Sequence, residues 1–500
     1  MADQQYKTQT SRCKIFNYPN NKIYSWIALG ASIFIWLLFK QLFTKPFITA
    51  DSYFYIKAAQ DNSNAGYWPV GYSKFLRFIV TISHNPYLLV TIQFIISQFS
   101  LLLFFLSIRT IYHLNKLTSN ILFISTLFNP LLIFACNHIM SDSLFMSFSL
   151  LWICLLLWIL VKPQSYMIIA QAILLLITFT IRYSGIYYPI ITLFVYLVSK
   201  FSIWKKIGGI AFSFICLIVF IQFTRLNMEE IGGLRIYSSA AGWKQASNAL
   251  YMYEHVANND SSAIPENFRE IHSITKNYFK NQHPQVDLYH IDREQSMGCF
   301  YMNWDKSPLN IYAQAKNGPI IDFTDKIKFS SFLNHYANYL IVHHPIAYFQ
   351  YVVMPNIFAY IFPYAEMYGP SNQIDNLLNS DLAEIAKGWF SIDSTKISLQ
   401  YVLLREELLC PFPFIFTVVN ILFLTLPILW VIFKIKLDRQ YRLPLLLLHI
   451  IGVLNFIFSI FTTTSVIRFQ LVNILIEGSI LLIIISLAYQ KENKTKTNYS

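Results

Sequence analysis

The chain has 500 residues, of which 55% are hydrophobic and only 13% are charged. Soluble domains carry about 25% charged residues, so this composition excludes an ordinary soluble protein and predicts an all-α, polytopic membrane protein. The net charge of +12 would suggest a nucleic-acid partner in a soluble chain. We expect no such partner, because the long polar region 225–407 holds 19 acidic against 14 basic residues. The basic excess lies in the tails and short loops.

Ten apolar runs predict helices that cross about 30 Å of hydrocarbon, so we expect about ten or more spans. In chain order the runs are 24–43, 87–107, 119–136, 142–161, 165–181, 186–199, 207–223, 409–433, 443–462 and 469–489. The tail before the first run is polar, which favours a retained span over a cleaved signal peptide. Basic residues such as Arg109, Lys162 and Arg439 gather in one set of loops. The positive-inside rule then predicts that both termini are cytoplasmic.

The runs divide the chain into three predicted parts. Residues 1–224 form an N-terminal transmembrane region with a first outer loop at 44–86. Residues 225–408 form a large extracytoplasmic domain of mixed or helical structure. Residues 409–500 form the C-terminal transmembrane region and a cytoplasmic tail.

The segment 346–365 is apolar enough to span the membrane, but a span there would move the basic stretch 434–442 outside. We therefore expect an interfacial or re-entrant helix that is broken at Pro355. Cys299 and Cys410 both fall on the predicted outer face, where a disulfide between them is one option.

Five ionisable side chains stand close to one predicted membrane plane, on the outer face: Asp51, Lys57, Asp142, Arg182 and Arg468. Short outer turns usually lack Lys and Arg, so the two arginines are unexpected there. Structural alternatives stay open for all five. The two acids precede helical runs and fit helix N-caps, the arginines fit side chains that reach lipid phosphates, and Lys57 fits an interfacial anchor.

Several short motifs share this face: "DSYFYIKAA" (51–59), "WPVGYSKFL" (68–76), "SDSLF" (141–145), "IRYSGIYYP" (181–189) and "RFQ" (468–470). In this order they resemble the GT-C glycosyltransferases, which include protein mannosyltransferases and the aminoarabinose transferases of lipid A. The resemblance implies that a polyprenyl-phosphate sugar enters from the membrane and is transferred on the outer face. A lone Asp stands where an acidic pair is common in that family. The cofactor is therefore unknown, and a divalent metal stays open.

The resemblance and the chemistry together give expected roles. Asp51 is the expected base that takes the acceptor's proton, and Asp142 orients an arginine or binds a sugar hydroxyl. Arginine suits the donor phosphate, because its planar guanidinium stays charged and binds two oxygens. The expected phosphate ligands are Arg468, Arg182 and Lys57. The expected substrate-binding residues are Tyr55, Trp68, Tyr72 and Glu477, the last of which would line a cavity below the outer face.

The sequence therefore predicts a membrane glycosyltransferase that acts on a glycan, lipid or protein acceptor. Its abundant Lys, Asn and Ile favour a bacterial inner membrane with the site facing the periplasm; an endoplasmic-reticulum membrane is the alternative. A lipid or glycan flippase or transporter would favour paired repeats and polar sites near mid-membrane. A polymerase or ligase of the O-antigen type would combine many spans with a large outer loop.

Overall fold

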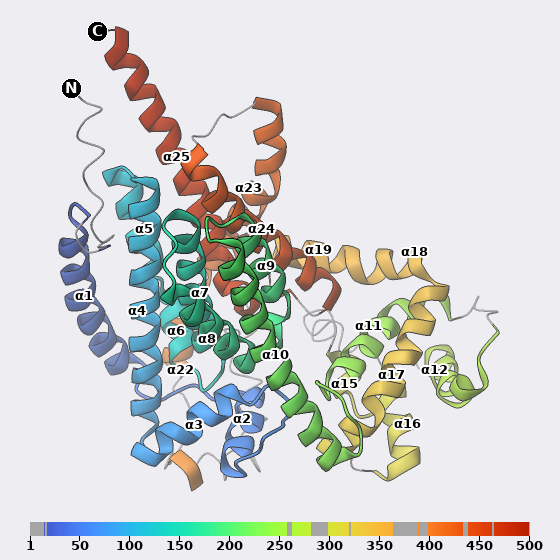
Figure 1. The fold of residues 1–500 in the computed structure, drawn as a ribbon. Helices are drawn as coiled ribbons and strands as arrows, with labels where there is room; N and C mark the ends of the chain where they lie inside the picture. The colour runs from blue at the N-terminus through green and yellow to red at the C-terminus, as the bar shows by residue number, and fades with distance from the viewer. Residues whose placement is uncertain are drawn as a thin grey trace.

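The computed structural model describes most of the chain, namely residue 15 and residues 18–257, 263–281, 299–319, 322–363, 388–390, 399–433, 439–462 and 465–499. These residues fold almost entirely into helices (Figure 1). Their β pairing is limited to an isolated parallel bridge between Phe47 and His138. The prediction of an all-α protein is confirmed.

Eight helical stretches in the described residues are long and apolar enough to cross a membrane. Helices suit this setting because they satisfy their backbone hydrogen bonds internally. The stretches are α1 (Asn21–Leu42), α4 (Pro86–Tyr112), α5 (Lys116–Leu127) with α6 (Pro130–Cys136), α7 (Asp142–Val161), α10 (Ile203–Gly232), α22 (Leu399–Leu409) with α23 (Pro411–Phe433), α24 (Arg439–Thr462), and η7 (Ile467–Gln470) with α25 (Leu471–Tyr499). The other two predicted spans coincide with shorter apolar helices: α8 (Tyr166–Ile181), and η2 (Tyr183–Tyr187) joined to α9 (Tyr188–Val198). The number and length of these apolar helices indicate a polytopic membrane protein.

The start of α1 and the end of α25 lie at the same end of the bundle (Figure 1). Here Asn21 donates a hydrogen bond to Thr110 at 3.1 Å, and Gln490 donates to the carbonyl of His113 at 2.7 Å. Arg109, one of the basic loop residues, lies at this end and donates to the carbonyl of Pro19 at 2.7 Å.

Two helices of the first outer loop, α2 (Ala50–Gln60) and α3 (Gly71–Ile82), lie at the opposite end (Figure 1). α2 begins with a capping box, in which the backbone N–H of Thr49 donates to Ser52 Oγ at 2.9 Å. α3 touches the end of α8 through Gly71, where a Cβ atom would lie 2.6 Å from the backbone oxygen of Thr180. The loop is thereby held against the ends of the membrane helices.

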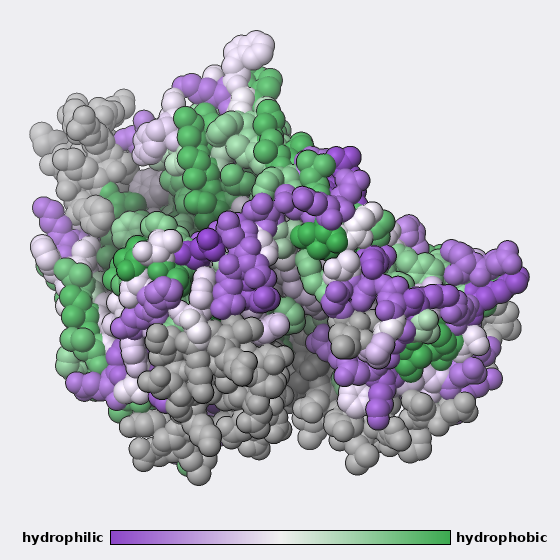
Figure 2. Space-filling view, turned by 90° about the horizontal axis from the view of Figure 1, so that it is seen from below, coloured by the Kyte–Doolittle hydropathy of each residue, from purple (hydrophilic) through white to green (hydrophobic). Residues whose placement is uncertain are grey.

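The polar region folds around a second hydrophobic core. Its centre is the pair α11 (Ala241–Val256) and α17 (Phe323–His343), surrounded by α12 (Arg269–Asn281), α15 (Phe300–Asn303) and α16 (Pro308–Asn317). α11 and α17 lie so close that a Cβ on Gly242 would overlap the backbone oxygen of Ser330. We call this unit the outer domain. Seen from its end of the molecule, hydrophilic side chains gather over it and across the middle of the face (Figure 2).

The predicted interfacial segment continues from α17 as α18 (Pro345–Tyr348), a π-helical turn (Phe349–Val353) and α19 (Met354–Ile361). The prediction of a break at Pro355 is wrong. The wider turn that precedes this proline accommodates its ring and missing N–H, so the helical run continues. Residues 364 and 365 of the segment lie outside the described residues.

α19 enters the C-terminal part of the membrane bundle. Asn356 donates to the carbonyl of Ile460 at 3.1 Å, and Tyr360 donates to Glu477 at 3.3 Å. The suggested disulfide is also wrong, because the structure forms no disulfide between Cys299 and Cys410.

Candidate functional site

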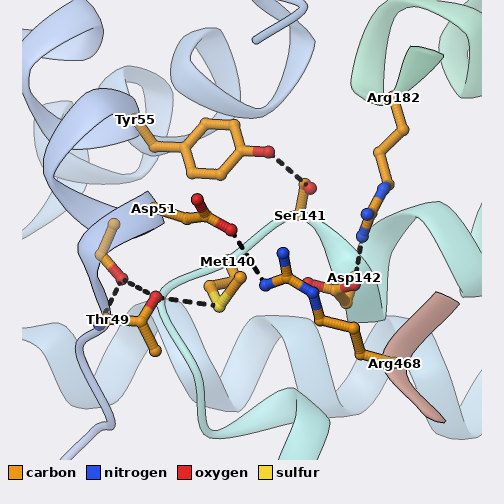
Figure 3. Close-up of polar contacts among 9 residues, drawn as sticks. Thr49, Asp51, Tyr55, Met140, Ser141, Asp142, Arg182 and Arg468 are labelled. Carbon is orange, nitrogen blue, oxygen red and sulfur yellow. Dashed lines mark hydrogen bonds and ion pairs between the residues drawn. The ribbon is translucent and has the colours of Figure 1, made fainter. Parts of the chain in front are cut away.

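A cavity of about 1260 Å³ lies between the ends of the membrane helices and the outer domain. On the membrane side it is lined by α2, the start of α7, η2 and η7; on the other side it is lined by α11 and α17. Four of the five ionisable residues predicted to share one plane line it: Asp51, Asp142, Arg182 and Arg468. The sequence places these residues far apart, and the fold brings them together (Figure 3).

The first ion pair joins the N-terminal and C-terminal membrane regions. Asp51 Oδ2 accepts a hydrogen bond from Arg468 Nη1 at 2.9 Å, and the two side chains are 23% and 13% exposed. Asp51 is the second residue of α2, and the cap itself is Thr49. The N-cap alternative is therefore wrong for Asp51, although its charge still lies favourably in the first helical turn.

The second ion pair lies beside the first (Figure 3). Arg182 Nη1 donates to Asp142 Oδ1, and the side chain of Asp142 is only 3% exposed. Asp142 is the first residue of α7, whose cap is Ser141, so the N-cap alternative is wrong here as well. Arg182 follows α8 in extended backbone, which turns its side chain toward the start of α7.

Phe469 connects the two pairs. Its ring lies 5.0 Å from the guanidinium carbon of Arg182 and 4.6 Å from that of Arg468. Both cations are therefore directed at acids and at one aromatic ring, not at lipid. A cation over an aromatic face gains about 0.5–2 kcal/mol, which helps to hold two like charges close together.

Tyr55 and Trp68 also line the cavity, as the sequence predicted for substrate-binding residues. Tyr55 Oη and Ser141 Oγ share a hydrogen bond of 2.8 Å, which ties α2 to the start of α7 (Figure 3). Burial raises the pKa of the Tyr55 phenol well above its usual value. The phenol therefore stays protonated and acts as a hydrogen-bonding group, not as an anion.

Three predicted site residues lie outside the cavity lining. Lys57 points away and pairs with Asp61 one helical turn later, at 3.2 Å, with its side chain 51% exposed. Tyr72 is fully buried, and its hydroxyl donates to Gln93 of α4 at 2.8 Å. Glu477 is fully buried as well and faces Tyr360 of α19, so it does not line a cavity below the outer face.

The structure adds residues that the sequence did not single out. Lys244, Gln245, Asn248 and Asn334 of the outer domain line the cavity opposite the ion pairs. The first three stand at positions i, i+1 and i+4 of α11. This polar spacing on one helix face is the signal that was available.

His138 also lines the cavity, between α6 and α7. Burial lowers the pKa of its imidazole to about 4, a shift that its hydrogen bond to the Phe134 carbonyl partly opposes. The ring is therefore neutral at physiological pH. In the described part of the chain, no group of three or more His, Cys, Asp and Glu side chains is placed to hold a metal ion.

Comparisons of the chain with protein-family models, with curated proteins and with solved structures find no match. The function must therefore be inferred from the geometry and chemistry of the cavity. Its distinctive feature is two acid–arginine ion pairs, side by side at the end of an apolar bundle.

Proposed function

We propose that this protein is a membrane glycosyltransferase of the GT-C type, which moves a sugar from a polyprenyl-phosphate donor to an acceptor. The supporting observation is that Asp51, Asp142, Arg182 and Arg468 line one cavity where membrane helices meet the outer domain. Such a donor has an apolar tail, an anionic phosphate and a polar sugar. A cavity between an apolar bundle and a polar domain can receive all three.

The arginines are the proposed ligands of the donor phosphate. A guanidinium has five N–H donors, so Arg182 can hold Asp142 and still donate to a phosphate oxygen. Phe469 keeps the two guanidinium groups on one ring, where their charges can act on one phosphate. Their charge stabilises the phosphate as it departs from the sugar.

Asp51 is the proposed base. Its contact with Arg468 uses Oδ2, which leaves Oδ1 to take a proton from the acceptor. As the acceptor oxygen bonds to the anomeric carbon, the bond from that carbon to the phosphate oxygen breaks. Its electron pair leaves with the lipid phosphate, and the acceptor proton goes to Asp51. A positioned base of this kind is typically worth about 10²–10⁴-fold in rate.

The proposed orientation places the cavity on the extracytoplasmic side of a bacterial inner membrane. Arg109 lies near the start of α1 and the end of α25, whereas α2 and α3 lie at the other end (Figure 1). With the basic end in the cytoplasm, the cavity faces the periplasm.

Transfer assays in lipid nanodiscs test the proposal, with synthetic polyprenyl-phosphate mannose and polyprenyl-phosphate glucose as donor probes. The expected result is donor-dependent sugar transfer or donor hydrolysis that Asp51→Asn lowers by about 10²–10⁴-fold, while the variant still binds the donor. Donor movement between leaflets that Asp51→Asn leaves unchanged would instead show a flippase and would contradict the proposal.

A further inference from the structure

The outer domain contributes mainly amide and other uncharged polar side chains to its wall of the cavity. Gln245, Asn248 and Asn334 line it, together with Lys244 and Ser331. Acidic residues of the cavity lining are confined to Asp51 and Asp142 on the membrane side. The outer-domain wall is thus rich in amides and carries no carboxylate among its described lining residues.

Three amides form a closed ring of hydrogen bonds on α11 and α17. Gln245 donates to Asn338 at 2.6 Å, Asn338 donates to Asn334 at 3.0 Å, and Asn334 donates to Gln245 at 2.7 Å. Each amide has two N–H groups and a carbonyl with two lone pairs. The ring uses one donor and one acceptor of each amide. Gln245 and Asn334, the two members that line the cavity, therefore each keep a donor and an acceptor for a ligand.

Two further polar atoms, which belong to residues that line the cavity, have no partner among the described residues. Asn248 is only 2% exposed, and its Oδ1 accepts no hydrogen bond. The indole Nε1 of Trp68 is buried and donates none. A buried polar atom without a partner costs about 1–3 kcal/mol, so a ligand that supplies one donor and one acceptor would be stabilised here.

An aromatic wall adjoins the amide wall. Trp68 lines the cavity beside Tyr67, and the ammonium of Lys244 lies 4.9 Å from the centre of the Trp68 ring. Lys244 thus bridges the amide wall and the aromatic wall. A ligand between them would meet paired donors and acceptors on one side and a flat apolar surface on the other.

We propose that this part of the cavity is a binding site for a carbohydrate acceptor. Hydroxyl groups are donors and acceptors at once, as the amides are, and the C–H faces of a sugar ring fit flat against an aromatic ring. An extended peptide would instead need backbone partners, and β pairing in the described residues is limited to the bridge between Phe47 and His138. The inference rests on the proposed function, since it names the class of the acceptor in that reaction.

Direct binding of acceptor probes tests the site without any donor. The probes are short oligosaccharides of hexoses and N-acetylhexosamines, and short Ser- and Thr-containing peptides, observed by saturation-transfer NMR with the full-length protein in nanodiscs. We expect oligosaccharides to bind and peptides not to bind. Gln245→Ala combined with Asn334→Ala should weaken oligosaccharide binding about thirtyfold, since it removes two hydrogen bonds of about 1 kcal/mol each.

The matched control is Asn227→Ala, because Asn227 is a half-buried amide on α10 that does not line the cavity. Oligosaccharide binding by this variant should equal that of the unaltered protein. Ser331→Trp is a second test, because it fills part of the cavity without removing an amide. This variant should weaken oligosaccharide binding as well. Oligosaccharide binding that the double amide variant and Ser331→Trp both leave unchanged would overturn the inference. Peptide binding that these two variants remove would overturn it as well. Donor binding depends on Arg182 and Arg468, so a failure of the proposed function would appear there separately.

Discussion

The carboxylate of Asp51 accepts a hydrogen bond from Arg468 at 2.9 Å, although 417 positions separate the two residues. The contact joins the first outer loop to η7, the turn directly before α25. Asp142 and Arg182 repeat the arrangement beside it, and Phe469 contacts both arginines. The two acids are thus placed by arginines that can also bind an anion.

Replacement of Asp51 by Asn should remove the proposed base while it keeps the shape of the side chain. We expect transfer to fall by about 10²–10⁴-fold and donor affinity to change little. Rates from radiolabelled donor and affinities from equilibrium binding separate the two effects. Asp61→Asn is the control, because Asp61 follows the same helix and pairs with Lys57 outside the cavity. Equal rates for the unaltered protein and Asp51→Asn would contradict the role.

The pair between Asp142 and Arg182 should contribute to stability as a unit. Arg182→Gln leaves a carboxylate that is only 3% exposed without its cation, which costs about 3–5 kcal/mol for a buried pair. Adding Asp142→Asn should restore much of this loss, since a neutral amide needs no counterion. Thermal unfolding in detergent of both single variants and of the double variant measures the coupling. Additive losses would show that the two side chains do not act together.

Much of this site was predictable from one sequence. Asp51, Asp142, Arg182 and Arg468 stand at predicted span ends on one face, and ionisable groups at such ends tend to meet at the same depth. Their partners were not predictable, because the packing of α2 against η7 decides them. The structure also rejects N-caps for the two acids, since Thr49 and Ser141 precede them.

Other predictions failed because short-range geometry and packing override residue type. Lys57 was a predicted phosphate ligand, but it forms an ion pair with Asp61 one helical turn later, outside the cavity. Glu477 was predicted to line a cavity. Instead, α19 packs into the bundle and Tyr360 covers the Glu477 carboxyl group. The amides of α11 and α17 were missed. The spacing of Lys244, Gln245 and Asn248 indicates a polar helix face, but only the packing of the outer domain decides that this face meets the cavity.

His138 gives a pH dependence whose sign follows from its lowered pKa. The folded protein keeps the imidazole neutral down to about pH 4, whereas the unfolded chain takes up a proton near its usual pKa of 6.5. Stability is therefore full above that value and is lost as pH falls toward 4. The nearby charges are Arg405 and Arg468, which lower the pKa, and Asp142, which raises it.

His138→Gln should remove this component of the pH dependence. Between pH 7 and pH 5 the unaltered protein should lose about 2 kcal/mol more stability than the variant, at about 1.4 kcal/mol for each unit of pKa shift. Thermal unfolding at both pH values measures the difference. Parallel losses in the two proteins would show that protonation of His138 does not contribute.

The cations of the outer face should differ in their effect on the donor. Arg468→Gln should weaken donor binding by at least tenfold, since a charge-assisted hydrogen bond to phosphate contributes about 1.5–3 kcal/mol. Lys57→Gln makes the corresponding change at an exposed residue outside the cavity, and donor binding should be unaffected. Equilibrium binding of polyprenyl-phosphate mannose to both variants provides the comparison. Equal losses would indicate general attraction of the lipid to a basic surface.

The decisive measurement is a structure of the full-length protein, determined by electron cryo-microscopy in nanodiscs with a non-hydrolysable polyprenyl-phosphate sugar analogue. The proposal predicts that the phosphate lies between Arg182 and Arg468, with the sugar beside Asp51 and the prenyl chain directed toward the membrane helices. A phosphate bound elsewhere, with both ion pairs undisturbed and the cavity occupied by solvent alone, would contradict it.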